Sequence, residues 1–300
     1  MGGFKLMNYA GPGGEARAAI AVGDQVIDLE QSGGVPWRTS LEALGNWDAA
    51  LPALTALAAK AGDVSSTPLA DVQLLAPILY PGAIYNAAAN YIDHQKEMNE
   101  GKSLDKSDTT PYFFLKSGPH CVIGPGAKIR LPKVSQQVDW EAELGVVIGK
   151  PARNVSVENA LDYVAGYTVF NDLSARDLGK PKGRRWLTDW FVHKNFEGSG
   201  PMGPWIVPAD DIADPHDIDI KLWVNDELMQ DSNSKYLFYN IAEQIEYVSR
   251  RLTLRPGDVF ATGTPSGVGR PRGIFLKPGD TVTIELGGIG TLQNPVVQGD

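Results

Sequence analysis

Val138-Asp139-Trp140-Glu141-Ala142-Glu143-Leu144 is the most informative segment of this chain. Its acidic and apolar residues alternate, so a strand built from it places Asp139, Glu141 and Glu143 on one face. The apolar continuation over residues 145–148 indicates that the strand enters a core. Carboxylates two residues apart repel one another unless water or a cation lies between them. The segment therefore predicts either a solvated strand face or a cation site.

The available ligands narrow the identity of such a cation. Oxygen ligands suit hard ions such as Mg²⁺, Mn²⁺ or Ca²⁺, whereas zinc prefers clusters of Cys and His that this sequence lacks. Asp172 supplies a third carboxylate, because it follows the apolar run 164–170 as a residue at a strand end does. The alternative for Asp172 is a turn-forming Asn-Asp pair at the surface.

The remaining sequence predicts a β-rich α+β protein. Its 300 residues include 33 Gly and 21 Pro without a fixed period, which is typical of many turns and short strands. One later stretch, residues 239–250, has helical spacing. The expected strands of this larger part lie at residues 146–148, 164–170, 218–224, 259–261 and 282–286.

A small N-terminal unit precedes this part. Residues 4–10 and 18–29 predict a β-hairpin around the turn Gly11-Pro12-Gly13-Gly14. Residues 41–61 carry Leu and Ala at helical spacing and end at Gly62, a helix stop. We therefore expect an α+β N-terminal domain over residues 1–75 and a large β domain over residues 76–300.

Composition excludes several classes of partner. The net charge is −9, and the Lys and Arg residues form no basic stripe, so nucleic acid is not expected as a partner. No long apolar run or N-terminal signal segment predicts a membrane or secretory destination. Cys121 is the single cysteine, so no intramolecular disulfide can form. We expect a cytoplasmic protein.

Two further positions carry candidate chemistry. His94 and Glu97 share a face if residues 90–97 are helical, and such a pair can act as a base and its orienting partner. Alternatively, Glu97 belongs to a solvated helix face. Lys194 lies among aromatic residues, either as a lysine that extends to solvent or as a partly desolvated cation facing an anionic intermediate. The other histidines carry no comparable signal.

In this order, the segments resemble the fumarylacetoacetate hydrolase family over residues 84–297. The matching strings are Asn90-Tyr91-x-Asp93-His94-x-x-Glu97, Phe113-Phe114-Leu115-Lys116, Asp139-Trp140-Glu141-Ala142-Glu143-Leu144, Gly166-Tyr167-Thr168-Val169-Phe170-Asn171-Asp172-Leu173-Ser174-Ala175-Arg176-Asp177 and Thr262-Gly263-Thr264-Pro265-Ser266-Gly267-Val268-Gly269. Because each string is short, the resemblance rests on all of them together.

The resemblance implies a mixed β-sandwich roll, usually a homodimer, with Mg²⁺ or Mn²⁺ held by Glu141, Glu143 and Asp172. It also implies catalytic roles, with His94 and Glu97 activating water and Lys194 facing the substrate's oxygens. The 262–269 loop is similar to the family's loop for the substrate carboxylate. The substrate-binding positions that the resemblance implies are Tyr91, Lys116, Arg176, Gly263, Thr264 and Pro265.

The function implied is hydrolysis of a C–C bond in an acylpyruvate-like β-diketo acid, such as maleylpyruvate, fumarylpyruvate or another ring-cleavage product, or a sugar-acid diketone. A divalent ion chelated by a 2-keto acid stabilises the enolate that cleavage leaves. The same chemistry serves decarboxylation or isomerisation of a 2-oxo dicarboxylate, which is the alternative activity. A non-enzymatic keto-acid-binding protein is a third reading, and the pairing of dyad and carboxylates argues against it.

Two features depart from the resemblance. Gly179 stands where many family hydrolases carry Gln, so a polar group near the reacting carbonyl is missing or comes from elsewhere. Residues 98–110 are longer and more polar than a minimal connection, which predicts either a lid over the substrate or a plain surface loop.

Overall fold

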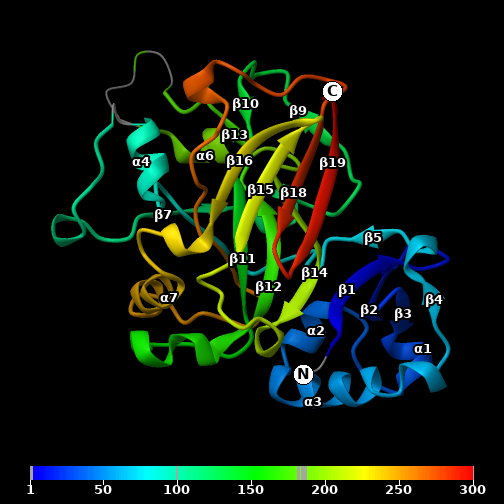
Figure 1. Ribbon diagram of the computed structural model, residues 1–300. Coiled ribbons are helices and arrows are strands. Elements are labelled where there is room, and N and C mark those ends of the chain that lie inside the picture. The colour runs from blue at the N-terminus through cyan, green and yellow to red at the C-terminus, as the bar shows by residue number, and fades with distance from the viewer. Residues whose placement is uncertain (1–2, 99–100, 181–182, 184–187, 300) are drawn as a thin grey trace.

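The computed structural model describes residues 3–98, 101–180, 183 and 188–299 (Figure 1). Within them the chain forms one large sheet, a five-stranded sheet and a two-stranded sheet. In spatial order the large sheet contains β4 (Thr67–Pro68), β3 (Gln25–Asp28), β2 (Ala16–Val22), β1 (Lys5–Ala10), β14 (Gly200–Pro208), β12 (Val164–Asn171), β11 (Ala142–Ile148), β17 (Val259–Ala261), β6 (Ile84–Ala87) and β7 (Phe113–Lys116), with β5 (Leu74–Leu75) beside β1 and β8 (Val122–Ile123) beside β14.

The smaller sheets lie around the middle of the large one. The five-stranded sheet contains β16 (Glu227–Asn233), β15 (Asp219–Val224), β18 (Thr281–Leu286), β19 (Gly290–Gln298) and β9 (Ile129–Leu131), and the two-stranded sheet pairs β10 (Val138–Asp139) with β13 (Ser174–Ala175). The α-helices are α1 (Leu29–Gly33), α2 (Ser40–Leu44), α3 (Trp47–Ala58), α4 (Ile92–Met98), α5 (Gly118–Cys121), α6 (Trp190–Lys194) and α7 (Ile241–Ser249). This β-rich α+β arrangement confirms the predicted fold class.

Strand β11 lies between two apolar cores, which explains why it is buried along its whole length. Val146 belongs to the core shared with the five-stranded sheet, and the neighbouring Val147 belongs to the core shared with α2 and α3. Figure 1 shows the five-stranded sheet over β11 and β12 and the N-terminal helices beyond β1. Successive side chains of a strand point to opposite faces, so each face of β11 has its own partner. The strand that carries the acidic segment is therefore firmly fixed.

The N-terminal unit differs from its predicted form in two details. The second predicted strand turns at Gly23, with positive φ, and continues as the separate strand β3. The predicted helix over residues 41–61 is two helices, because the chain breaks at Gly45-Asn46 between α2 and α3. Strand β1 pairs with β14, so the N-terminal strands extend the large sheet. The division into two domains at residue 75 stays a prediction.

Several central strands gave no clear sequence signal. β14 contains Gly200, Pro201, Gly203 and Pro204, which are residues typical of turns, yet it lies between β1 and β12. Strands β16 and β19 were also not predicted. The predicted strands at residues 146–148, 164–170, 218–224, 259–261 and 282–286 and the helix at residues 239–250 all form, with small differences at their ends.

Candidate active site

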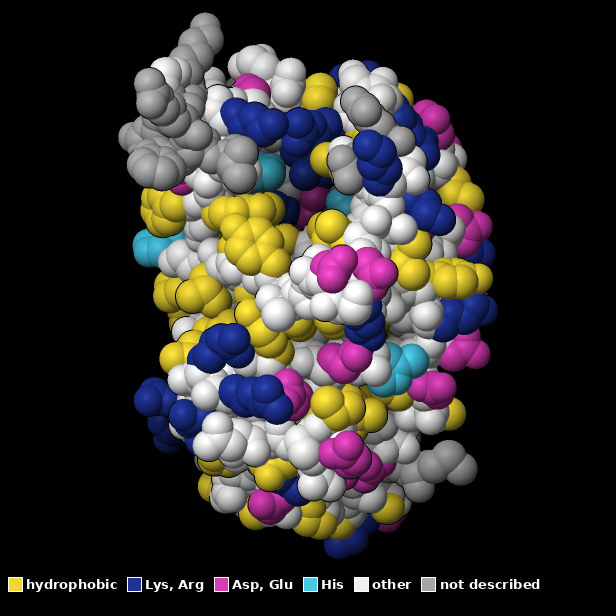
Figure 2. Space-filling model, turned by 90° about the vertical axis from the view of Figure 1, so that its left-hand side faces the viewer, with side chains coloured by type: hydrophobic (Ala, Val, Ile, Leu, Met, Phe, Trp, Pro, Cys, Tyr) yellow, Lys and Arg dark blue, Asp and Glu magenta, His cyan; other side chains and the backbone are white. Residues whose placement is uncertain are grey.

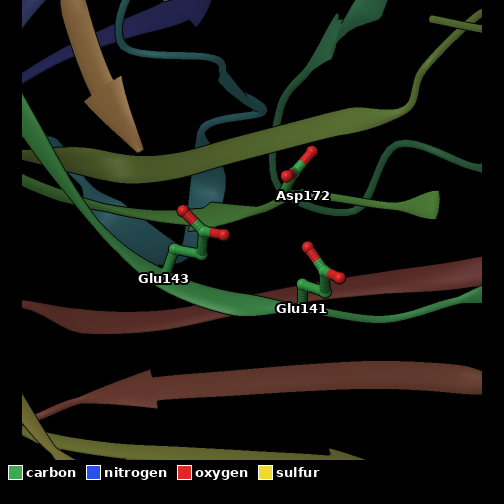
Figure 3. Close-up of side chains that lie close together, drawn as sticks. All are labelled: Glu141, Glu143 and Asp172. Atoms are coloured by element: carbon green, nitrogen blue, oxygen red, sulfur yellow. The ribbon is translucent and has the colours of Figure 1, made fainter. Parts of the chain in front are cut away.

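Three buried carboxylates converge where β11 and β12 meet. Glu143 lies on β11, Glu141 immediately precedes it, and Asp172 immediately follows β12. The antiparallel pairing of the two strands continues beyond their ends, because the Asp172 amide donates a 2.9 Å hydrogen bond to the Glu141 carbonyl. One oxygen from each carboxylate lies within 4.8 Å of the others. Figure 3 shows the three groups turned toward one common space, as the sequence predicts.

Asp139 does not join this group, contrary to the alternation of the acidic segment. The chain leaves strand geometry at Trp140 and Glu141, between β10 and β11, and the simple period of two is lost there. Asp139 instead accepts hydrogen bonds from the backbone amides of Gly269 (2.7 Å) and Arg270 (3.0 Å). Its carboxylate therefore holds the chain that follows the 262–269 loop.

The carboxylate group fits a hard divalent cation. Burial raises the pKa of Glu143 well above its usual range, and the neighbouring Asp172 and Glu141 carboxylates raise it further. Oδ1 of Asp172 is buried and accepts no well-aligned hydrogen bond within the described part of the chain, although the Lys116 ammonium group lies 3.1 Å from it. A divalent cation would relieve the repulsion among the carboxylates, and an all-oxygen ligand set suits Mg²⁺ or Mn²⁺.

Three cations surround the carboxylates. The ammonium group of Lys194 lies 2.6 Å from Glu141 Oε2 and 2.7 Å from Asp172 Oδ2. Arg176 donates to Asp139 Oδ2 at 2.8 Å and to Glu141 Oε1 at 2.6 Å. Burial disfavours the ionised form of Glu141, but Lys194 and Arg176 outweigh burial and hold its pKa well below the usual range. We call the region around Glu141, Glu143 and Asp172 the floor of the site. Lys194 does not extend to solvent, because it is buried on this floor.

Lys116 lies behind the carboxylates. Its ammonium group donates to the carbonyl of Leu173 at 3.0 Å and to Ser199 Oγ at 3.1 Å, and it lies 3.1 Å from Asp172 Oδ1. Burial lowers its pKa, and Asp172 opposes that change. Lys116 does not line the cavity, so its observed contacts position Asp172. Its predicted contact with substrate stays a prediction.

The predicted dyad lies on α4, across from the carboxylates. His94 Nδ1 is 3.3 Å from Glu97 Oε2, and His94 lines the same cavity as Glu141, Glu143 and Asp172. Glu97 holds the imidazole from one side and accepts from the Gly267 amide at 3.0 Å with its other oxygen. Because Nδ1 of His94 faces Glu97, Nε2 is the ring nitrogen that can accept a proton from another group.

The 262–269 loop connects both sides of the site. The Gly263 amide donates to Glu143 Oε2 at 2.8 Å, and Gly263 has a φ of +104°, which favours glycine. Thr264 lines the cavity and donates to the Ala142 carbonyl at 2.9 Å. On α4, Asp93 accepts from Ser266 Oγ at 2.9 Å. The loop therefore positions a carboxylate and the dyad together.

Four of the six predicted substrate-binding residues do not line the cavity: Tyr91, Lys116, Gly263 and Pro265. Tyr91 is buried, and its hydroxyl has no partner among the residues described. Burial raises its pKa well above the usual range, and nearby Glu143 adds to the effect. The carbonyl of Pro265 accepts from Gln230 Nε2 at 2.9 Å.

The cavity has a volume of about 300 Å³, enough for a small acid. Figure 2 shows it as a hollow with acidic side chains at its bottom and Lys and Arg side chains along its upper rim. Tyr112, Phe114 and Trp190 form an aromatic wall, with Phe114 stacked on Trp190 at 4.6 Å between ring centres. Arg270 also lines the cavity, and sequence reasoning gave no signal for it.

His193 is the other functional candidate that the sequence did not reveal. Its imidazole lines the cavity and stacks on Trp190 at 5.6 Å, and neither ring nitrogen has a partner in the described structure. Burial, with Lys194 and Arg176 nearby, lowers the pKa of His193 to about 2. A Cβ at Gly179 would lie 3.2 Å from its Nδ1. The glycine that departs from the family pattern therefore leaves room for this neutral imidazole.

The predicted lid, residues 98–110, includes two residues, 99 and 100, outside the described structure. The rest is held against α7 and its preceding turn. Lys106 pairs with Glu243 at 2.7 Å, and the Thr109 hydroxyl lies 2.7 Å from the Tyr239 hydroxyl. The Leu104 amide donates to a side chain of α4, Gln95 Oε1, at 2.9 Å. These contacts connect the segment to the helix that carries the dyad, and closure over substrate stays a prediction.

Comparison with known proteins yields a consistent group of relatives. The family model for fumarylacetoacetate (FAA) hydrolase, C-terminal, matches residues 83–297. The chain is 43% identical over 230 residues to the mitochondrial oxaloacetate tautomerase fahd2 of Xenopus laevis, covering 76% of this chain and 69% of that protein. It is 38% identical over 298 residues to 2,4-didehydro-3-deoxy-L-rhamnonate hydrolase of Sphingomonas sp. (strain SKA58), covering 98% and 96%.

A solved structure of high similarity is a maleylpyruvate hydrolase from Sphingobium sp. SYK-6, in complex with manganese (II) ion and pyruvate. Its TM-score is 0.79 at 30% sequence identity, and the match covers 99% of this chain and 100% of that one. Hydrolases and a tautomerase thus occur among similar proteins. In the described part of the chain, no helix is long and apolar enough to cross a membrane.

Proposed function

The chain belongs to the fumarylacetoacetate hydrolase family, and from this premise we propose that it hydrolyses a C–C bond in an acylpyruvate-like 2,4-dioxo acid, releasing pyruvate and a carboxylic acid. The observation that carries the proposal is the position of His94, which lines one cavity together with Glu141, Glu143 and Asp172. Hydrolysis needs a base for water and a site that stabilises negative charge, and the two lie across one small space.

Three side chains, His94, Glu97 and Lys194, have separate roles in the proposed reaction. His94 accepts a proton from water at Nε2, while Glu97 keeps the ring oriented through Nδ1. The water oxygen then attacks the distal carbonyl carbon, and the bond between that carbon and the methylene group breaks. Its electron pair leaves with the pyruvate fragment as an enolate, which takes up the proton held by His94 to give pyruvate. Lys194 places a fixed positive charge beside the carboxylates, where the oxygens of the 2-oxo acid are expected.

Glu141, Glu143 and Asp172 would hold Mg²⁺ or Mn²⁺, since three buried carboxylates with oxygens within 4.8 Å of one another fit such an ion. When bound, the ion would supply Lewis-acid stabilisation of the charge that develops on the 2-oxo oxygen. Arg176 keeps Glu141 ionised for this purpose.

The relatives support this class of substrate. One is named for a diketo sugar acid, and the other is a maleylpyruvate hydrolase in complex with pyruvate. A ring-cleavage product and a sugar-acid diketone therefore remain the two substrate types that we propose. A cytoplasmic location and homodimeric assembly stay predictions from the sequence.

Tautomerisation of a 2-oxo dicarboxylate is the second candidate. A relative with 43% identity is named oxaloacetate tautomerase, and moving a proton on and off carbon 3 needs one base beside a charge-stabilising site. His94 meets that requirement without any attack by water. The Gly179 departure also weakens the analogy to family hydrolases that carry Gln there.

Steady-state assays on metal-loaded protein separate the candidates. We expect pyruvate release from 2,4-dioxo acids such as maleylpyruvate, fumarylpyruvate and a diketo sugar acid, and loss of that activity with a chelator. Oxaloacetate would be assayed in parallel for keto-enol interconversion by absorbance and for CO₂ release. If every dioxo acid is stable while oxaloacetate tautomerises rapidly, the hydrolase proposal is wrong and the second candidate replaces it.

A further inference from the structure

The charged groups on the cavity floor are already paired with one another. Lys194 contacts Glu141 and Asp172, and Arg176 contacts Asp139 and Glu141. Lys116 also lies beside Asp172. These cations are therefore committed to the carboxylates, and their net attraction for a second anionic group of the substrate is small.

The rim of the same cavity is different. Arg270 and Lys180 line the cavity, and both are exposed. Within the described residues, neither side chain makes a hydrogen bond or an ion pair with an acidic group. Figure 2 shows Lys and Arg side chains gathered along the upper edge of the hollow. The rim therefore offers positive charge without a counterion from the described chain.

Arg270 is fixed relative to the floor through its backbone. Its amide donates to Asp139 Oδ2 at 3.0 Å, and the preceding Gly269 amide donates to Asp139 Oδ1 at 2.7 Å. Asp139 lies two residues before Glu141, so these hydrogen bonds tie the Arg270 backbone to the segment that carries a floor carboxylate. A Cβ at Gly269 would lie 2.0 Å from the Ile274 carbonyl, which shows how closely the chain packs here. The arginine therefore starts from a defined place above the floor.

We propose that Arg270, assisted by Lys180, binds a second carboxylate at the distal end of the substrate, so that the site prefers 2-oxo dicarboxylates over 2-oxo monocarboxylates. This inference rests on the proposed function, because it assumes that the first carboxylate and the 2-oxo group bind at the floor. Arg is suited to this role because its planar guanidinium binds a carboxylate through two parallel hydrogen bonds.

The test compares two ligands with the same five-carbon chain, 2-oxoglutarate and 2-oxopentanoate, which differ by the second carboxylate. Neither has the 4-oxo group that hydrolysis requires, so calorimetry on Mg²⁺-loaded protein measures binding without turnover. We expect wild-type protein to bind 2-oxoglutarate about tenfold more tightly, the value of one charged hydrogen-bonded contact. Arg270→Met should reduce that preference to about twofold or less and leave 2-oxopentanoate binding unchanged.

Three further variants sharpen the result. Arg270→Lys should keep part of the preference, because it retains the charge and loses the fork geometry. Arg272→Met is the matched control: Arg272 lies two residues away, and its guanidinium donates to the Met229 carbonyl at 3.2 Å. It should retain the full wild-type preference. Lys180→Met should reduce the preference less than Arg270→Met does.

The possible failures are distinguishable. If metal-loaded wild-type protein binds both ligands equally, or if Arg270→Met keeps the tenfold preference, this inference is overturned while the proposed function stands. If neither ligand binds to the metal-loaded wild type, the 2-oxo acid reading of the floor fails, and this inference fails with it.

Discussion

The floor and the α4 wall of the cavity are built in different ways. The floor carboxylates lie on β11 (Glu143), immediately before it (Glu141) and immediately after β12 (Asp172). The two strands lie between two apolar cores, and buried cations surround the carboxylates. The wall is the seven-residue helix α4. Hydrogen bonds that Asp93 and Glu97 accept from Ser266 and Gly267 attach it to the 262–269 loop. The floor depends on the sheet, whereas the wall depends on a few side-chain contacts.

In the proposed function, this difference separates two kinds of catalytic contribution. The floor gathers charge, which must be held rigidly because unpaired buried charges are costly. The wall presents a base, which needs correct orientation and access to water. Variants of the floor should therefore abolish ion binding, while variants of the wall should leave ion binding intact and slow proton transfer.

Glu143→Gln tests the floor and should have the largest effect. We expect turnover to fall at least about 10⁴-fold, because Lewis-acid stabilisation is worth several kcal/mol. The rise in Tm that Mg²⁺ or Mn²⁺ gives to wild-type protein should disappear. The metal-free variant should melt at or above the wild-type temperature, since one of three repelling carboxylates is neutralised. Glu285→Gln, an exposed glutamate on β18, is the control, and unchanged metal binding in Glu143→Gln would contradict the assignment.

His94→Ala tests the wall. We expect hydrolysis of the best 2,4-dioxo acid to fall by roughly 10² to 10⁴, the range for losing a positioned general base. Metal affinity, measured by calorimetry, should stay at the wild-type value. Decarboxylation of oxaloacetate should fall less, because it does not require activated water. Lys96→Ala on the exposed face of the same helix is the control, and full hydrolase activity in His94→Ala would remove the dyad from the mechanism.

Asp93→Ala tests how the wall is attached. Asp93 Oδ2 accepts a hydrogen bond from Ser266 Oγ at 2.9 Å. Removing the Asp93 carboxylate should therefore loosen α4 and leave the carboxylates of the floor unchanged. We expect kcat to fall about tenfold, equivalent to one hydrogen bond to a charged group. Ser266→Ala should give a smaller loss, and the double variant should not lose much more than Asp93→Ala alone. Fully additive losses would indicate that the two residues act separately.

His193→Gln gives the smallest predicted effect, on stability. The imidazole stays neutral in the folded protein because its pKa is lowered to about 2, whereas the unfolded chain takes up a proton below pH 6.5. The unfolded state therefore binds more protons at pH 5.5, and the folded state loses stability as the pH falls. Between pH 7.5 and 5.5, wild type should lose about 1 kcal/mol more than the variant in urea unfolding. His120→Gln, an exposed histidine, should behave as wild type.

The sequence predicted the floor better than the rest of the site, for physical reasons. Alternation along a strand and a carboxylate at a strand end made Glu141, Glu143 and Asp172 candidates, and the family resemblance joined them into one ligand set. The structure brings their oxygens within 4.8 Å of one another. Asp139 does not join the other carboxylates, because the chain leaves strand geometry at Trp140 and Glu141 and the alternation is lost there. Arg270 lines the cavity because its backbone is hydrogen-bonded to Asp139, which is distant in sequence. No local sequence pattern predicts such a contact.

Two other misses have the same origin. β14 is rich in Gly and Pro, which normally indicate turns, and its place in the sheet follows from its pairing with β1 and β12. His193 lines the cavity beside Gly179, where a Cβ would lie 3.2 Å from its Nδ1. Both outcomes depend on tertiary neighbours, which local sequence patterns do not describe.

The 262–269 loop limits which insertions and loop exchanges this protein can accept. Its backbone donates to Glu143 at Gly263 and to Glu97 at Gly267, so a single inserted residue would displace the Glu143 carboxylate and the His94–Glu97 pair together. Recombining the loop with that of another enzyme would therefore exchange both functions as one block. Substitutions for new substrates belong on the rim, where a side chain such as Arg270 enters the cavity and the backbone beneath it stays unchanged.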